Sequence, residues 1–467
     1  MTDRRSPATH VRSRPLLFAL LWGLMFGAGV AAAQGPQKPP PDTQPPNVVL
    51  LIIDTLRADH LGAYGYTKRP TSPTLDGLAK QSVVFERAYS ASSWTRSALA
   101  SMFSGQFVHE HKVYSERTAD RLPNRVFTMT EFFANLGYDV GMFYTNPHFK
   151  FGMLQGARFK LYEWDGDASF IYNKALPWLG RHKNRSFFLV VHNLDPHDKY
   201  KYRESVPFSP THPPIREARN LYEQSDRTGR GGKGIGCDRR THGRVLSDSD
   251  LDKVKAAYDG EIAYLDNQIK RLLDQLTKLG LDNNTVVIVT ADHGEEFLDH
   301  GGYWHGCTLH DELVRAPLMI RLPGGTAGRV STPVSTVDIF PTLVDLIDPG
   351  ALEELGLSGQ SLLPAAQGKP LESRPQFMAT GFRKSWQHAV VDGDYKLIVD
   401  GSTGAKALYN LKDDPKELRN LLELPLGFSA VYAEKAAQLE ALLGDLPPRP
   451  TGGAEPEGGA DEDGGLH

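Results

Sequence analysis

Two apolar runs in this chain each end in a carboxylate, and together they indicate a metal-binding edge of a sheet. Residues 286–290 lead into Asp292 and His293, and residues 48–53 lead into Asp54. Unbroken apolar or β-branched runs are typical of strands buried on both faces of a mostly parallel sheet, and ligands bind at the carboxyl edge of such sheets. The three side chains are therefore expected to meet there, where two carboxylates and an imidazole can bind a divalent cation. A capped strand end with a surface histidine is the alternative for Asp292 and His293 considered alone.

A candidate nucleophile lies in a segment rich in small hydroxyl residues, Ser92 to Gly105. The apolar spacing after Thr95 predicts a helix that begins near this residue. Free N–H groups and the positive end of the dipole stabilise an anion or an alkoxide at the start of a helix, so a hydroxyl there suits nucleophilic attack. The alternative is an ordinary N-cap followed by a closely packed helix.

The composition describes an ordinary globular protein and argues against a nucleic-acid partner. Of the 467 residues, 40% are hydrophobic and 23% are charged, and the formal net charge is −4. Residues 1–33 contribute +3, so a chain without them changes from −4 to −7. A mildly acidic body does not favour a polyanion, although it permits a small anionic substrate. The length allows up to about three domains, but large α/β enzymes often have one continuous core.

Both ends of the chain are predicted to lie outside the folded body. A basic start, an apolar stretch at residues 16–30 and three alanines at 31–33 predict a signal peptide over residues 1–33, with export to the periplasm or the medium. The apolar stretch is short for a membrane span, so we expect no stable span after cleavage; an uncleaved membrane anchor is the alternative. Proline-rich residues 34–46 predict an extended linker, and acidic, glycine-rich residues 447–467 predict a disordered tail.

Between these ends, the pattern predicts a catalytic domain at residues 47–345 and a C-terminal subdomain at residues 346–446. Apolar residues that repeat every three or four positions predict a long helix over residues 251–279 that packs on the sheet. The C-terminal elements are expected to be antiparallel. They are a hairpin of residues 388–391 and 395–399 and a closing helix at residues 431–443.

Two features are left open by the sequence. Residues 199–250 hold many arginines, prolines and glycines, and a basic lid over an anionic substrate and a solvated insertion both agree with this composition. The chain has two cysteines, Cys237 and Cys307, which excludes a disulfide-dense scaffold. They can pair in an oxidising compartment, but nothing in the sequence brings them together, so packing is the default for Cys307.

These residues and their neighbouring motifs resemble the sulfatase family of the alkaline-phosphatase superfamily. The resemblance spans roughly residues 47–425. It implies an α/β fold with a large, mostly parallel sheet flanked by helices and a small antiparallel C-terminal subdomain. It also implies hydrolysis of a sulfate ester carried by a small molecule, a glycan or a lipid. The motifs are Asp54-Thr-Leu-Arg-Ala-Asp59, Trp94-Thr95 with Ser104-Gly105, His192-Asn-Leu-Asp-Pro-His197, Ala291-Asp292-His293-Gly294 and Arg315-Ala-Pro317.

The family resemblance implies roles for individual residues. One divalent cation, usually calcium and in phosphoester relatives often manganese or zinc, would be held by Asp54, Thr95, Asp292 and His293. Thr95 falls at the nucleophile position, where coordination lowers the pKa of an attacking hydroxyl. His192, His197 and His305 fall near the ester oxygens. One of these histidines could protonate the leaving alcohol, because histidine titrates near neutral pH; a hydrogen-bonded structural role is the alternative for each.

Several positions depart from the sulfatase pattern. Sulfatases carry a cysteine or serine that maturation converts to formylglycine, followed by proline and arginine. Here Thr95 stands at that position, with Ser97 and Leu99 in place of the other two. Threonine cannot form the aldehyde, so no formylglycine is expected, and a threonyl ester must be cleared by water or an acceptor alcohol. Thr55 stands where sulfatases have a second metal-binding aspartate, which implies a more weakly held cation.

These departures leave three functions open. The first is hydrolysis of sulfate esters. The second is hydrolysis of a phosphodiester or phosphonate ester, or transfer of a phosphate headgroup, with Thr95 as nucleophile. The third is a non-catalytic, anion-binding protein. In an alternative alignment Ser92, four residues before Arg96, is the modified residue, but Trp94 then replaces the proline. Arg96 could also reach the ester anion from beside Thr95, although adjacent side chains on a helix point in different directions.

Overall fold

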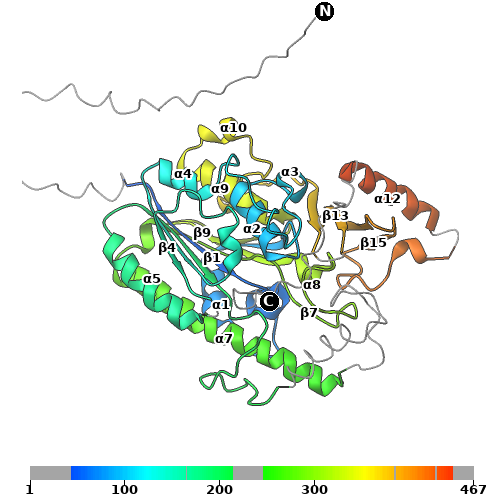
Figure 1. Cartoon of the computed structure of the whole chain (residues 1–467), viewed down its shortest axis with the longest axis horizontal. Coiled ribbons are helices and arrows are strands. Elements are labelled where there is room, and N and C mark those ends of the chain that lie inside the picture. Colours follow the sequence, from blue (N-terminus) through cyan, green and yellow to red (C-terminus); the bar gives the residue numbers. More distant parts are fainter. Residues whose placement is uncertain (1–43, 165, 214–245, 383–384, 426–428, 445–467) are drawn as a thin grey trace, which may run out of the picture. The chain divides into compact units, whose positions relative to one another are not determined.

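The computed structural model describes residues 44–164, 166–213, 246–382, 385–425 and 429–444. The predicted signal peptide, most of the linker, the acidic tail, and much of the arginine-rich segment with Cys237 lie outside these residues. Within them, Figure 1 shows a large sheet between two layers of helices, and a smaller sheet that is covered by α12 (Ser429–Leu443). The predicted α/β fold class is therefore confirmed.

A large, mostly parallel sheet forms the centre of the fold. Among the described residues, its strands lie in the order β10-β2-β9-β6-β1-β5-β3-β4, and β11 pairs with β2. In this described part, β9 runs antiparallel to β2 and β6, and the other pairs are parallel. The strands are β1 (Asn47–Ile53), β2 (Val83–Tyr89), β3 (Asp139–Tyr144), β4 (Phe159–Tyr162), β5 (Phe187–Asn193), β6 (Thr285–Ala291), β9 (Arg315–Arg321), β10 (Gly328–Val330) and β11 (Val334–Ser335).

The register of three neighbouring strands explains why residues far apart in the sequence meet at one edge. β1 lies between β5 and β6, with Ile53 opposite both Asn193 and Ala291. Because the three strands are parallel, the residues that follow them leave the sheet at the same edge. Asp54 is fixed there by a hydrogen bond of 2.9 Å from its N–H to the Asn193 carbonyl.

Helices cover both faces of the large sheet, so alternate residues of β1 pack against different layers. Val48, Leu50 and Ile52 belong to the apolar core under α2, α4 and α9. Val49, Leu51 and Ile53 belong to the core under α1, α5 and α7. The helices are α1 (Pro73–Ala79), α2 (Thr95–Ser104), α3 (Val108–His111), α4 (Met129–Asn135), α5 (Ala168–His182), α7 (Asp248–Lys278), α8 (Asp311–Val314), α9 (Ile339–Ile347), α10 (Ala351–Leu355) and α11 (Leu363–Ala366).

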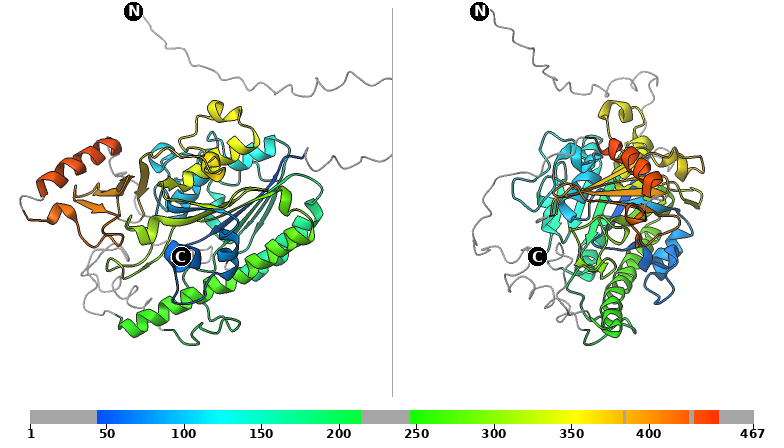
Figure 2. Two further views of the ribbon diagram at one scale, coloured as in Figure 1. Left: turned by 180° about the vertical axis from the view of Figure 1, so that it is seen from behind. Right: turned by 90° about the vertical axis from the view of Figure 1, so that its right-hand side faces the viewer.

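The long helix predicted from the apolar stripe is confirmed as α7, which lies beside α5 on one face of the sheet (Figures 1 and 2). The helix begins after Ser247, whose hydroxyl accepts the N–H of Asp250. It also supports the candidate site, because the Tyr258 hydroxyl donates to the Thr55 carbonyl at 2.7 Å, directly after Asp54. The buried stripe is Val254, Tyr258, Ile262, Leu265, Ile269, Leu272 and Leu276.

The C-terminal part forms a small antiparallel sheet. Its strands are β12 (Gln376–Thr380), β13 (Gln387–Asp392), β14 (Tyr395–Asp400) and β15 (Lys406–Asn410), and α12 packs on one face. The predicted hairpin and closing helix are thus confirmed. Lys396 on β14 is buried and pairs with Asp311 and Glu417, each at 2.8 Å, which joins this sheet to the main body. The predicted boundary after residue 345 stays a prediction; α11 packs in the main core.

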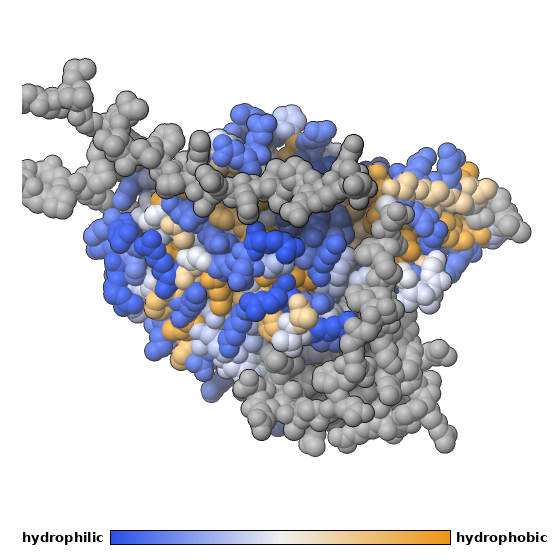
Figure 3. Space-filling model, turned by 45° about the horizontal axis from the view of Figure 1, so that its top comes forward, coloured by the Kyte–Doolittle hydropathy of each residue, from blue (hydrophilic) through white to orange (hydrophobic). Residues whose placement is uncertain are grey.

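The described surface is largely hydrophilic in Figure 3. Hydrophobic side chains reach it on the lobe that carries α12, where Val431 and Leu442 are exposed. Among the described helices, none combines the length and the apolar character needed to cross a bilayer. The expected signal peptide and export concern residues beyond this part and stay predictions.

Candidate active site

The four side chains predicted to bind a cation form one buried cluster. Asp54 follows β1, Asp292 and His293 follow β6, and Thr95 begins α2. The Thr95 hydroxyl oxygen lies 3.0 Å from Nε2 of His293. That nitrogen lies 3.7 Å from Asp54 Oδ1 and 3.5 Å from Asp292 Oδ2. The structure thus brings these residues together, while their roles stay predictions.

The hydrogen bonds of His293 determine which ring nitrogen carries a proton. Nδ1 lies 2.9 Å from the Gly294 carbonyl oxygen, which can only accept, so Nδ1 is protonated. Burial lowers the pKa of His293 to about 4, so the ring is neutral and Nε2 keeps its lone pair. The Thr95 hydroxyl therefore donates to Nε2. A cation bound by Nε2 and the two carboxylates would take the place of this hydrogen bond.

Asp54 and Asp292 are a buried carboxylate pair whose charge lacks compensation. Burial raises the pKa of Asp292 to about 7, and burial together with the Asp292 charge raises the pKa of Asp54 to about 6. Asp54 Oδ1 and Asp292 Oδ2 have no hydrogen-bond partner among the described residues. Buried polar atoms normally have partners. The oxygens of this pair, with Nε2 of His293, therefore fit a hard or borderline divalent cation.

Thr55 contributes its backbone to the site, where the sulfatase pattern has a second aspartate. Its N–H lies 3.3 Å from Asp292 Oδ1. Its φ of 54° places a β-branched residue in the left-handed region, which is an unfavourable conformation for this side chain. The turn after β1 therefore stores strain at the point where the first carboxylate of the site is held.

His192 and Asn146 approach Asp54 from two neighbouring strands. Nε2 of His192, on β5, lies 3.6 Å from Asp54 Oδ2, and burial lowers the pKa of this histidine to about 3. The Asn146 amide, after β3, donates to the same carboxylate oxygen at 2.8 Å. Sequence reasoning missed Asn146. Its signal was present, because residues 139–144 form a third strand that ends in polar residues.

His305 lies beside His293, and His197 lies beside His305. The His305 ring centroid is 4.5 Å from that of His293 and 5.0 Å from that of His197. Nδ1 of His305 lies 2.9 Å from Oε1 of Glu295, and the other Glu295 oxygen accepts the Tyr200 hydroxyl at 3.1 Å. Glu295 is buried, and burial raises the pKa of its carboxyl well above the usual range, so its hydrogen bond rather than its charge orients the His305 ring. Glu295 was also missed from the sequence, because its position two residues after His293 carries no periodic signal.

Arg96 does not point at the Thr95 hydroxyl. Its guanidinium lies 3.6 Å above the Phe151 ring and donates to the Arg117 carbonyl at 2.6 Å. Its Nε donates to Nδ1 of His148 at 3.3 Å, so its contact with the site runs through that histidine. Burial lowers the pKa of His148 to about 3, which keeps its ring neutral. His148 is a third residue that sequence reasoning missed.

Aromatic side chains line one side of the histidines. Trp94 stacks on Phe382 with centroids 4.0 Å apart and lies 6.0 Å from His305, while Trp304 lies 4.6 Å from His305. The φ of Trp304 is 80°, a rare value for a bulky residue that is found where structure serves a site. Cys307 packs against this group and is disulfide-bonded. Packing is therefore not its whole role; the other cysteine of the chain lies outside the described residues.

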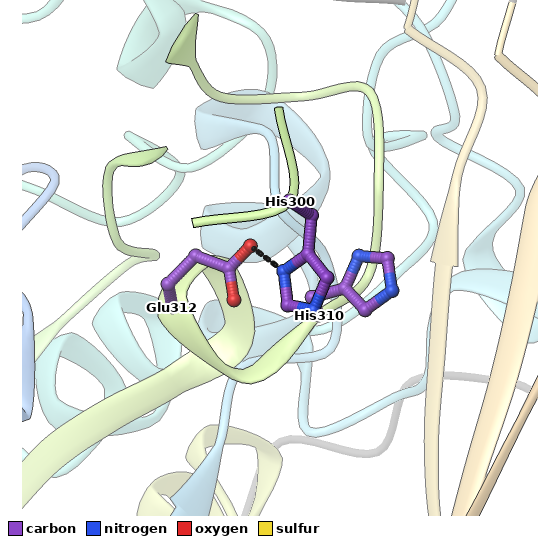
Figure 4. Close-up of side chains that lie close together, drawn as sticks. All are labelled: His300, His310 and Glu312. Atoms are coloured by element: carbon purple, nitrogen blue, oxygen red, sulfur yellow. Dashed lines mark hydrogen bonds and ion pairs between the residues drawn. The ribbon is translucent and has the colours of Figure 1, made fainter. Parts of the chain in front are cut away.

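A second group of titratable side chains, His300, His310 and Glu312, lies near the small sheet (Figure 4). Nδ1 of His300 lies 2.7 Å from Glu312, and its Nε2 lies 3.1 Å from the Glu417 carbonyl oxygen. The rings of His300 and His310 are stacked, with centroids 3.7 Å and planes 9° apart. Rings stacked in this way cannot both direct a nitrogen at one ion. The geometry is that of an imidazolium paired with a carboxylate.

The ion pair of His300 and Glu312 is expected to make the stability of the folded protein fall as pH rises into the alkaline range. Burial lowers the pKa of His300, but the hydrogen bond and charge of Glu312 outweigh it and raise the pKa from 6.5 to about 9. The folded state holds the proton more tightly than the unfolded chain, so the stabilisation is complete below pH 6.5 and is lost as pH rises through 9. We expect the urea midpoint to fall across this window, and to fall less in His300→Gln. The exposed His109, changed to Gln, is the control; identical profiles for His300→Gln and wild type would contradict the expectation.

Comparisons with known proteins agree with this geometry. A family model described as Sulfatase matches residues 46–349, and a model described as N-sulphoglucosamine sulphohydrolase, C-terminal, matches residues 299–444. A choline-sulfatase of Rhizobium meliloti (strain 1021) is 26% identical over 440 residues, which cover 82% of this chain and 84% of the relative. An arylsulfatase of Clostridium perfringens (strain 13 / Type A) is 26% identical over 473 residues, which cover 85% and 93%.

A solved structure extends the likeness to the fold. The crystal structure of the phosphonate monoester hydrolase of Agrobacterium radiobacter is 25% identical, with a TM-score of 0.65, and the match covers 85% of this chain and 96% of that one. The Sulfatase model alone covers well over half of the sequence. The chain therefore belongs to the sulfatase family of hydrolases, with an alkaline-phosphatase-like fold.

Proposed function

We propose that the protein hydrolyses sulfate esters with Thr95 as its nucleophile and one divalent cation. The proposal rests on the Thr95 hydroxyl, which lies 3.0 Å from Nε2 of His293 beside two buried carboxylates. A cation held by Asp54, Asp292 and His293, with Thr95 as a further ligand, would neutralise the ester oxygens and acidify the attacking hydroxyl. Calcium is our first choice, with manganese or zinc as alternatives.

The chain's own residues supply the remaining steps. Thr95, whose hydroxyl proton would be lost to solvent, attacks the sulfur atom while the S–O bond to the alcohol breaks. The covalent threonyl ester is then hydrolysed by water, since threonine cannot expel the group as an aldehyde hydrate does. His305 donates a proton to the leaving alcohol, and its ring is oriented for this by Glu295 at 2.9 Å. His197 and His192 bind the ester oxygens. Asn146 holds the Asp54 carboxylate at 2.8 Å.

A phosphodiester or phosphonate ester is the second candidate substrate, and transfer of a phosphate headgroup is a variant of it. Thr95 itself favours this candidate, because a simple alcohol nucleophile suits phosphoryl chemistry. The phosphonate monoester hydrolase likeness points in the same direction. In either case, the ester group would be attached to a small molecule, a glycan or a lipid, and we expect no nucleic-acid partner.

The test compares three aryl esters that share one leaving group: a sulfate, a phosphate diester and a phosphonate monoester. Purified protein is freed of metal with a chelator and is assayed after addition of calcium, manganese or zinc. Turnover of the sulfate, dependent on one of these ions, is expected. Faster turnover of a phosphorus ester identifies the second candidate. Binding of sulfated ligand without turnover of any ester under any metal identifies an anion-binding protein instead.

We also propose that the protein is exported, with cleavage after Ala33. The support is the basic and apolar composition of residues 1–33. Edman sequencing of the mature protein, recovered from the periplasm or the medium, tests this. A mature chain that still begins at Met1 and stays with the membrane fraction indicates the uncleaved anchor.

The orientation of His305 by Glu295 predicts a change in leaving-group dependence. In Glu295→Gln the amide can turn its NH2 toward Nδ1, and the imidazole then loses its fixed orientation. We expect kcat to fall by about 10–100-fold, as is usual for such supporting residues, with little change in KM. The fall should be larger for poor leaving groups, because they need the proton most.

The measurement is kcat for a series of aryl esters with leaving phenols of different acidity. Tyr200→Phe, which removes only the second hydrogen bond to Glu295, is the matched control and should lie between wild type and Glu295→Gln. An equal loss for every leaving group would assign Glu295 a merely structural role.

A further inference from the structure

A cavity of about 560 Å³ lies apart from the candidate active site. Its walls come from the segment after β1, the first turns of α7, and the loop that follows β15 in the small sheet, so two parts of the chain enclose it. None of the residues that line it belongs to the Thr95 and His293 cluster. Its volume is in the range of small-molecule sites.

Every carboxylate that lines this cavity is already paired with a cation. Arg57 forms two-point contacts with Asp59, at 2.9 Å, and with Asp299, at 2.8 Å and 3.2 Å. The other two carboxylates, Asp311 and Glu312, pair with side chains that do not line the cavity. These pairs are Asp311 with Lys396 at 2.8 Å and Glu312 with His300 at 2.7 Å.

In contrast, some of the basic side chains that line the cavity form no ion pair with a described residue. Lys68 and Arg69 pair with Asp252. Lys255 on α7 and Lys416 on the loop after β15 have neither an ion pair nor a hydrogen bond among the described residues. The Arg315 guanidinium donates to the Glu86 carbonyl, at 3.1 Å and 2.8 Å, and has no carboxylate partner in the part of the chain that the structure describes. The cavity is thus lined by an excess of positive charge.

We infer that this cavity binds a small anionic ligand whose carboxylate or sulfate group is held by Lys255 and Lys416. Lys255 is partly buried and has no direct ion-pair partner, since Asp299 and Asp59, whose charges act on it, are both bound by Arg57. A partly buried ammonium in this position is unfavourable. An oxyanion supplies the missing partner and, with Arg315 beside it, a third donor contact. Leu418, which is 69% exposed, and Pro415 give the cavity an apolar rim for the organic part of the ligand.

The electrostatic state of Lys255 agrees with this assignment. Burial lowers its pKa, and the neighbouring guanidinium of Arg57 lowers it further, against the opposing charge of Asp299. The floor of the cavity also contacts the candidate active site through the backbone. Arg57 donates from Nη1 to the carbonyl of Glu295 at 2.9 Å.

Site-resolved lysine acetylation tests the inference without any assay of turnover. Full-length protein is treated briefly with acetic anhydride at constant ionic strength, and peptide mass spectrometry gives the rate at each lysine. The probes are inorganic sulfate, D-glucuronate and the neutral D-glucose. We expect one or both anions to slow acetylation of Lys255 and Lys416 by about threefold or more when in excess over their Kd. Lys412, exposed on the same loop, should keep its rate throughout.

Two variants separate this cavity from anion binding at the candidate active site. Lys416→Met removes a surface cation and should abolish the protection of Lys255, whereas His197→Ala should leave that protection unchanged. Sulfate protection alone identifies an oxyanion site without need of a sugar; glucuronate protection alone identifies a carboxylated sugar. Unchanged acetylation of Lys255 with both anions, or protection that survives Lys416→Met but not His197→Ala, would overturn the inference.

Discussion

Replacing Thr95 with alanine is expected to reduce turnover by a factor on the order of 10⁴ or more, because it removes the attacking oxygen. This hydroxyl lies 3.0 Å from Nε2 of His293. Thr95→Ser keeps the oxygen and should keep measurable activity. The fold should be retained, since alanine has a high helix propensity at this position in α2. The measurement is kcat under saturating metal, with the urea midpoint as the check on folding.

Ser97→Ala is the matched control for this substitution. Ser97 lies one position beyond Arg96 on the same helix, is buried, and has no hydrogen-bond partner for its hydroxyl among the described residues. Its removal should leave kcat unchanged. If Thr95→Ala keeps most of its activity while Ser92→Ala loses it, the alternative alignment with a modified Ser92 is correct and the threonine nucleophile is wrong.

Asp292→Asn is expected to abolish metal-dependent activity and at the same time to stabilise the metal-free protein. Asparagine keeps the oxygen that accepts the N–H groups of Thr55 and His293 at 3.3 Å and 2.9 Å. It removes a negative charge that, without a cation, is buried beside Asp54. With chelator present, the midpoint temperature of unfolding should therefore be a few degrees higher for Asp292→Asn than for wild type. Added calcium, manganese or zinc should no longer raise the midpoint of the variant.

The same carboxylates predict how pH acts on the chelated protein. Their pKa values are raised, to about 6 for Asp54 and about 7 for Asp292, from 3.8. Between the unfolded pKa of 3.8 and the raised values, the folded state binds more protons than the unfolded chain. Stability therefore falls as pH rises from about 4 to about 7. A bound cation competes with these protons, so its stabilising effect should grow over the same window.

The measurement is the unfolding midpoint of wild type and Asp292→Asn at several pH values, with chelator and with each metal, together with metal analysis of both proteins. Asp413→Asn, on an exposed loop, is the control and should behave as wild type. Equal metal content in wild type and Asp292→Asn would contradict a role for Asp292 as a ligand.

The effects expected for Thr95→Ala and Asp292→Asn both depend on the carboxyl edge of the large sheet, and the periodicity of the sequence alone indicates this edge. Residues 48–53 and 286–290 are apolar without alternation, and this pattern requires burial on both faces, hence a central parallel strand. Parallel strands share a carboxyl edge, so Asp54 and Asp292 had to lie near each other. The sequence also predicted α7 and the hairpin of β13 and β14. Apolar residues repeat with a period of about 3.6 in the helix and about 2 in the strands, because each element buries one face.

Other parts of the site depended on motif likeness rather than on periodicity. The resemblance to the sulfatase pattern indicates Thr95, His192, His197 and His305, and the structure brings these residues to the same edge as Asp54. Their proposed chemistry still awaits the experiments above. The pairing of Cys307 was open in the sequence, because two cysteines can be close or far apart in a folded chain.

The fold class, the strands that end in Asp54 and Asp292, and the long helix α7 could be predicted from the amino-acid sequence, because they follow from local periodicity and short motifs. Which side chains support the site became clear from the folded structure. Asn146 reaches Asp54, Glu295 orients His305, and Lys255 and Lys416 face one cavity. Such contacts depend on how loops and whole elements pack against one another, which the spacing of residues along the chain does not specify.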